Sequence, residues 1–138
     1  MDNSVLFVCK DPGGMNGIVP VFDAWVKGGG DAVLIANGKA AELLQKPPRP
    51  RPVRWYPTPE RAVLDFPAPA ALVTTFCEGG GMGRGLIPLL KGRCPTIAHL
   101  DFWSAPFRPG GSFAAVEYHP AYVAVSDRFG AACARVGW

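Results

Sequence analysis

Short, mainly apolar runs recur along this chain, the clearest of them the uninterrupted run 5–9, and segments with helical spacing separate them. A run without polar alternation is typical of a parallel strand, because helices cover both faces of a parallel sheet. A weaker run at 53–56, behind the proline-rich stretch 47–52, predicts one further strand. The strong runs, which we expect to be strands, are 5–9, 32–36, 71–75, 96–100 and 122–125.

Helix signals fall between these runs. Thr58 is a predicted N-cap, with Pro59 at the first helical position, and its helix continues to about Phe66. Ser126 and Asp127 are expected to cap a last helix that begins at Arg128. The other predicted helices are 18–26 with Pro20 in its first turn, 39–45, and 86 to about 91.

This alternation predicts an α/β three-layer sandwich around a doubly wound, mostly parallel, Rossmann-like sheet of about six strands. We expect the strand order 3-2-1-4-5-6, because it places the two glycine-rich loops of the chain side by side at the switch point. Strands 1, 4 and 5 are then central. Their residues Val5, Phe7, Leu72, Val73, Ile97 and Leu100 are expected to be buried.

Composition bounds the function classes. The 138 residues suit one domain, with 49% hydrophobic and 18% charged residues and a net charge of +3. Arg49, Arg51 and Arg54 alternate with prolines, which indicates a solvated connector and not a nucleic-acid interface. No run is long enough for a membrane span, and the first ten residues lack the pattern of a secretory signal. We therefore expect a cytoplasmic protein without a nucleic-acid partner and without a membrane span.

The four cysteines, Cys9, Cys77, Cys94 and Cys133, never form a CxxC pair. This spacing predicts neither a metal site nor a disulfide framework, and buried thiols are expected at Cys9 and Cys77.

The first glycine-rich loop, predicted at 10–17, contains Asp11, Gly13, Gly14 and Asn16. Its backbone N–H groups would approach an anion or a sugar at a helix N-terminus. The loop is not GxGxxG, and strand 2 ends without an acidic residue, which argues against an NAD site. A strained turn that needs glycine is the alternative interpretation.

The second glycine-rich loop, at 76–85, holds five glycines in the seven positions 79–85. It lacks the GK[ST] ending of a phosphate-binding P-loop, so nucleotide hydrolysis is not predicted. Five glycines exceed what a turn needs, and we favour a ligand-facing loop in which Arg84 contacts an anion. The candidate ligand residues of this loop are Glu78, Gly80, Gly81 and Arg84.

Strand 5 ends in Asp101, with Trp103 two residues later. Both are candidate ligand residues, since an aspartate here can accept from hydroxyl groups and tryptophan stacks on sugars. The alternative is that Asp101 caps a turn and Trp103 packs under the following loop. His99 is expected to be a buried histidine with satisfied hydrogen bonds. No catalytic set, metal site or cofactor is predicted.

These residues resemble the amino-terminal domain of GT-B glycosyltransferases and of the related UDP-N-acetylglucosamine 2-epimerases. The resemblance rests on strand 5–9 running into Gly13–Gly14, on segment 32–36 entering a helix, and on the glycine-rich loop 79–85. It implies that the chain is the half that receives the acceptor, and that a second Rossmann-like domain holds most of the nucleotide-sugar contacts. The chain alone would then be inactive.

The first functional hypothesis is therefore the acceptor-side domain of a glycosyltransferase-like or sugar-nucleotide-processing protein, with a sugar or nucleotide sugar as its ligand. A non-catalytic module that binds a nucleotide or another small ligand is the alternative. We expect a missing second domain, or a second copy in a homodimer, to cover the apolar residues of segment 104–120 and of the two residues just before it. These residues are Phe102, Trp103, Pro106, Phe107 and Phe113. A loop folded over strands 5 and 6 is the other interpretation of that segment.

Overall fold

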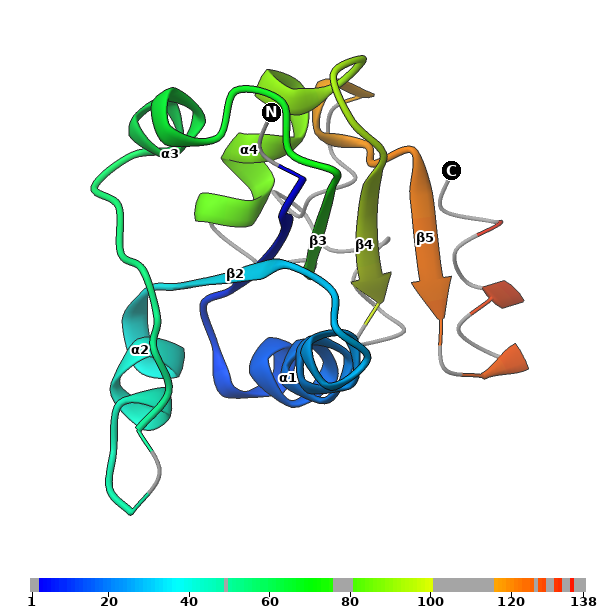
Figure 1. The fold of residues 1–138 in the computed structure, drawn as a ribbon. Helices are drawn as coiled ribbons and strands as arrows, with labels where there is room; N and C mark the ends of the chain where they lie inside the picture. Colours follow the sequence, from blue (N-terminus) through cyan, green and yellow to red (C-terminus); the bar gives the residue numbers. More distant parts are fainter. Residues whose placement is uncertain are drawn as a thin grey trace.

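Five parallel strands form the central sheet of the computed structural model, in the order β2-β1-β3-β4-β5 (Figure 1). The structure describes residues 3–48, 50–75, 81–100, 116–125, 127–128, 131–132 and 135. The strands are β1 (Val5–Cys9), β2 (Ala32–Ala36), β3 (Ala71–Thr75), β4 (Thr96–Leu100) and β5 (Tyr122–Val125). These bounds confirm the five strong apolar runs, and the α/β sandwich with a doubly wound parallel sheet is confirmed with them.

Strands β3, β4 and β5 are the segments that were predicted as strands 4, 5 and 6. The interior strands β1, β3 and β4 are therefore the predicted central strands 1, 4 and 5. All five residues of β1 are buried, because helices pack on both of its faces. Of the core residues expected on these strands, Val73 and Ile97 are half-buried and the others are buried. The others are Val5, Phe7, Leu72 and Leu100.

Strand 3, predicted at 53–56, is wrong in extent. Arg54 makes a single parallel bridge to Ile35 of β2, and its backbone exchanges hydrogen bonds with Leu34 and Ala36. This contact lies on the outer side of β2, where the order 3-2-1-4-5-6 places that segment. Pro50, Pro52 and Pro57 lack the N–H groups that a longer ladder would need, so the pairing ends at one residue.

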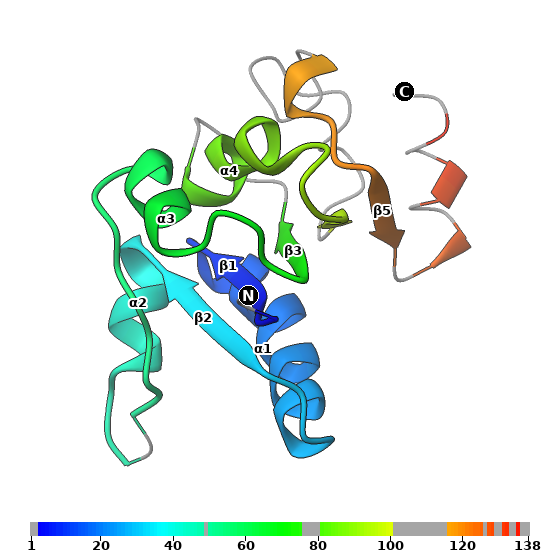
Figure 2. The same cartoon turned by 45° about the horizontal axis from the view of Figure 1, so that its top comes forward.

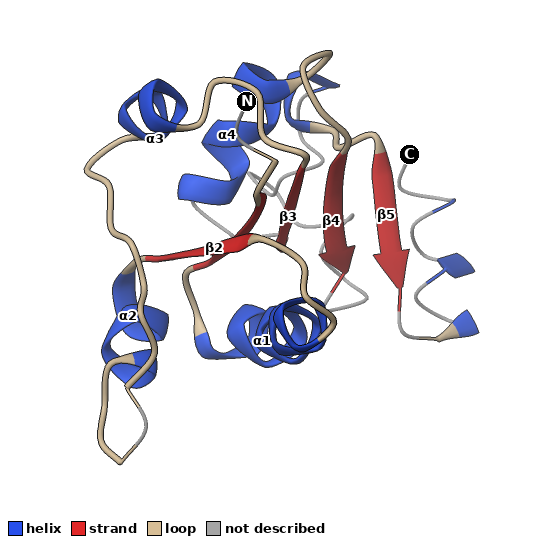
Figure 3. Cartoon of the chain, viewed as in Figure 1, coloured by secondary structure: helices blue, strands red, loops and turns tan. Residues whose placement is uncertain are grey.

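Among the described residues, helices pack on both faces of the sheet (Figures 1 and 3). Helices α1 (Pro12–Lys27) and α2 (Gly38–Leu44) pack with Val5, Phe7 and Cys9 on one face. Helices α3 (Pro59–Asp65) and α4 (Met82–Leu90) pack with Leu6 and Val8 on the other, and Figure 2 shows them side by side. A short 3-10 turn, η2 (Val116–Tyr118), precedes β5.

The predicted starts of two helices are wrong. Helix α1 begins at Pro12 and not at residue 18, and α4 begins at Met82 and not at residue 86. Gly13, Gly14, Asn16 and Gly17 are therefore helical, and Pro20 lies inside α1 instead of in its first turn. The predicted N-cap of α3 is confirmed, because the Thr58 side chain accepts a hydrogen bond from the backbone N–H of Arg61.

Within the ranges that the structure describes, no helix is both long and apolar enough to cross a membrane.

Candidate functional site

The switch point of the sheet lies between β1 and β3. From β1 the chain passes through α1 to β2 on one side, and from β3 it passes through α4 to β4 on the other. Both helices therefore begin at the carboxyl edge of the sheet, on opposite faces of neighbouring strands. In open α/β sheets ligands bind at this point, and helix N-termini there present N–H groups and a partial positive charge.

The first turn of α1 is fixed by its cap. The Asp11 side chain accepts a hydrogen bond from the backbone N–H of Gly14 at 2.7 Å, and Pro12 occupies the first helical position. Both features stabilise a helix start. Together they bring the residues that were expected in a loop into the helix.

Two glycines of α1 lie tightly against the sheet. A Cβ atom at Gly14 would lie 2.6 Å from Oγ1 of Thr75, and a Cβ atom at Gly17 would lie 2.6 Å from Nδ1 of His99. Neither position has room for a side chain. The glycines are thus needed for close packing of the helix on β3 and β4, and the expected strained turn with positive φ does not occur at either.

Helix α4 approaches β3 from the opposite face. A Cβ atom at Gly83 would collide with Oγ1 of Thr74, and this hydroxyl donates to the carbonyl of Val8 at 3.2 Å. Thr74 and Thr75 are both buried and point to opposite faces of β3. Consequently, both helix N-termini are held close to the end of the same strand.

The α4 N-terminus has no side-chain cap. Its N-cap residue is Gly81, which supplies no side chain to the N–H groups of the first turn. Arg84 lies in this turn, and its guanidinium carbon is 4.2 Å from the ring centroid of Tyr118. The predicted anion contact is therefore stacked on η2, the turn that leads into the amino end of β5.

The structure brings together only part of the predicted site. Asp11, Gly14, Gly81 and Arg84 lie in the first turns, or at the N-caps, of the two helices at the switch point. Gly13 is exposed in the first turn of α1. The remaining predicted site residues, Glu78, Gly80, Asp101 and Trp103, lie outside the described residues, as do Phe102, Pro106, Phe107 and Phe113.

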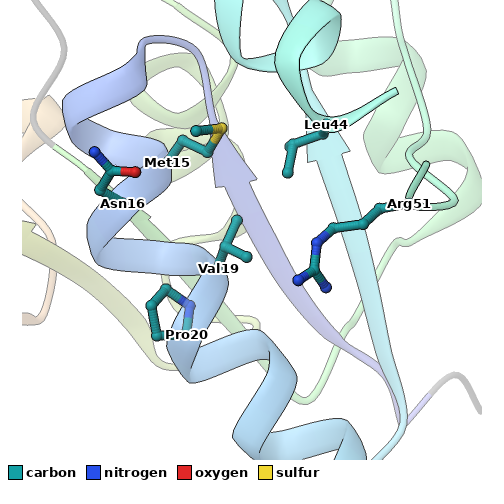
Figure 4. Close-up of a pocket in the computed structure, with 6 residues that line it drawn as sticks. All are labelled: Met15, Asn16, Val19, Pro20, Leu44 and Arg51. Atoms are coloured by element: carbon teal, nitrogen blue, oxygen red, sulfur yellow. The ribbon is translucent and has the colours of Figure 1, made fainter. Parts of the chain in front are cut away.

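Asn16 lines a different place, a hollow of about 270 Å³ between α1 and the end of α2 (Figure 4). Its walls are mainly apolar, and Arg51 closes one side. The Arg51 guanidinium is held by both carboxylate oxygens of Asp23, with the second contact at 2.8 Å. The hollow thus combines apolar walls with one amide and one neutralised cation. Its lining consists of Met15, Asn16, Val19, Pro20, Leu44 and Arg51.

Sequence reasoning missed the polar residues under the helices. Thr74 and Thr75 were expected only as part of an apolar run, and the expectation of a satisfied His99 is wrong at one atom. His99 is half-buried, and its Nδ1 is buried without a hydrogen-bond partner in the described part of the chain. Two polar residues at the end of β3 were a signal, since strand ends at the switch point face the helix starts.

Among the described residues, no three His, Cys, Asp or Glu side chains gather in a way that could hold a metal ion. Cys9 is buried, and Cys77 lies outside the described residues. Burial raises the pKa of the Cys94 thiol, which disfavours its reactive thiolate form.

Removing the cap of α1 is expected to have a modest cost. Asp11→Ala should lower the free energy of unfolding by about 1 kcal/mol, because the Gly14 N–H loses its acceptor. Asp11→Asn keeps an acceptor oxygen and serves as the control. Urea denaturation of both variants measures the difference, and equal loss in the two would show that the cap is not the cause.

Comparison with protein-family models, with curated protein sequences and with solved structures finds no match to this chain.

Proposed function

We propose that this chain is a ligand-binding, Rossmann-like domain that receives a sugar or a nucleotide sugar at the carboxyl edge of its sheet. The observation that carries the proposal is the convergence of the α1 and α4 N-termini on the end of β3, each held there by a glycine without room for a side chain. Backbone N–H groups at such helix starts favour phosphate and hydroxyl oxygens.

The local chemistry suits a phosphorylated sugar. The uncapped first turn of α4 offers N–H donors, and the Arg84 side chain adds a cation in the same turn. Gly81, which is half-buried, leaves the backbone at the N-cap accessible to a ligand. Because the charge of Arg84 is delocalised over a planar guanidinium, it can stack on Tyr118 and still pair with a phosphate.

The resemblance to GT-B glycosyltransferases and UDP-N-acetylglucosamine 2-epimerases extends this proposal. In that arrangement the domain is the acceptor side of a transferase or a sugar-nucleotide-processing protein, and a second Rossmann-like domain completes the cleft. The domain by itself would bind ligand weakly and would not turn it over.

A non-catalytic small-ligand module is the second candidate, and the hollow between α1 and α2 favours it. Its mainly apolar walls, the Asn16 amide and the paired Arg51 suit a small neutral molecule better than a phosphate. A ligand there would leave the N-terminus of α4 untouched.

Nitrogen-15 NMR titrations with UDP-N-acetylglucosamine, UDP and N-acetylglucosamine separate these candidates. The proposal predicts shifts of the Gly14, Gly81 and Gly83 amides with UDP and its sugar conjugate. Shifts confined to Val19 and Leu44 would favour the second candidate. No shift at millimolar ligand would contradict both.

Arg84→Gln is the variant that tests the phosphate contact, and Arg61→Gln is its control. Arg61 is exposed on α3, so the two substitutions remove the same charge at different places. We expect UDP affinity to fall about tenfold in the first variant and to stay unchanged in the second.

A further inference from the structure

The imidazole of His99 lies directly beneath α1. A Cβ atom at Gly17 would lie 2.6 Å from Nδ1, 2.8 Å from Cε1 and 3.6 Å from Cγ of this ring. The helix backbone therefore rests on one edge of the imidazole. Any larger residue at 17 would lift the helix from the sheet.

His99 does not act alone in this contact. It pairs in register with Thr75 of β3, so the two side chains stand next to each other on the same face of the sheet. Gly14 lies against Thr75 and Gly17 against His99, one helical turn apart. Two glycines of α1 and two polar side chains of the sheet thus form one strip, which ends at the Asp11 cap.

We propose that His99 is a positioning residue for the ligand site at the carboxyl edge. Its ring sets the height of the first two turns of α1 above β4, and so places the N–H groups at the start of that helix relative to those of α4. This inference rests on the proposed function, because it assigns His99 a role in holding the same site.

One ring nitrogen of His99 lies in this contact. Nδ1 is buried against Gly17 and has no hydrogen-bond partner among the residues that the structure describes.

Three variants test the positioning role. His99→Ala removes the ring, His99→Phe keeps a planar ring without nitrogens, and Ile97→Ala is the control. Ile97 lies two residues earlier on the same strand and the same face, and it is half-buried like His99. Ile97→Ala thus removes a half-buried side chain from the same face of β4 at a position other than the contact with Gly17.

UDP is the probe, and its affinity is measured by NMR at a temperature where each variant is fully folded. His99→Ala should weaken UDP binding about tenfold, while His99→Phe and Ile97→Ala should stay within about threefold of the natural sequence. Because each variant is fully folded at this temperature, a lower folding stability by itself would leave the UDP affinity unchanged.

The outcomes separate the two proposals. If UDP does not bind the natural sequence, the proposed function fails before His99 is tested. If UDP binds and His99→Ala binds it equally well, the positioning role is wrong and the function stands. If His99→Phe is as weak as His99→Ala, the nitrogens and not the ring shape matter, which overturns the steric mechanism.

Discussion

Phe7→Ala should lower the free energy of unfolding by about 3–5 kcal/mol, the range for truncating a large aromatic side chain in a core. Phe7 is 2% exposed on the strand that lies between β2 and β3. Its ring meets that of Phe22 edge to face, with centroids 5.5 Å apart. Both the buried area and this pair are lost in the variant, and the cavity forms under α1, where the sheet and helix backbones prevent collapse.

Urea denaturation followed by far-ultraviolet circular dichroism measures this loss. Trp55→Ala is the control, because the Trp55 side chain is larger than that of Phe7 but is 63% exposed. Its cost should stay within about 0.5 kcal/mol, as for other surface positions. A cost below about 1 kcal/mol for Phe7→Ala would contradict the central position of β1.

Gly83→Ala should lower the free energy of unfolding by about 1–3 kcal/mol, the usual cost of forcing a methyl group into a packed interior. The new Cβ would collide with Oγ1 of Thr74, and Cβ of Thr74 would lie 2.9 Å away. Either α4 moves away from β3 or the hydroxyl loses its bond to Val8. In an isolated helix the same change would be stabilising, since alanine has the higher helix propensity.

A double-mutant cycle with Thr74→Ala identifies the cause. Removing the Thr74 hydroxyl relieves part of the collision. Gly83→Ala should therefore lower the free energy of unfolding less in the Thr74→Ala background than in the natural sequence. Gly13→Ala is the matched control, because Gly13 is exposed in the first turn of α1. It should leave stability unchanged or raise it by up to about 1 kcal/mol. Additive costs in the cycle would exclude the Thr74 contact as the reason.

Five strands could be predicted from the sequence alone, and their order agrees with the prediction once strand 3 is left out. Each apolar run is local, and a run without alternation has one stable environment, a sheet covered on both faces. For this reason the bounds of β1 to β5 agree with the predictions residue by residue. The segment around Arg54 was placed correctly beside β2, but its prolines reduced a strand to a bridge.

The start of α1 has a local signal in Asp11 and Pro12, whereas the start of α4 and the helical place of the glycines depend on tertiary packing. Local rules assign Gly14, Gly17 and Gly83 to loops, because glycine is a poor helix former and is common in turns. Their place in helices depends on Thr75, His99 and Thr74, which lie on strands and leave no room for a Cβ atom. Thr75 and His99 are far along the chain from Gly14 and Gly17, whereas Thr74 belongs to the strand just before α4. The same distance in sequence hid His99, whose role depends on a helix that lies more than seventy residues before it. Contacts of this kind arise from packing, which no local pattern of residues encodes.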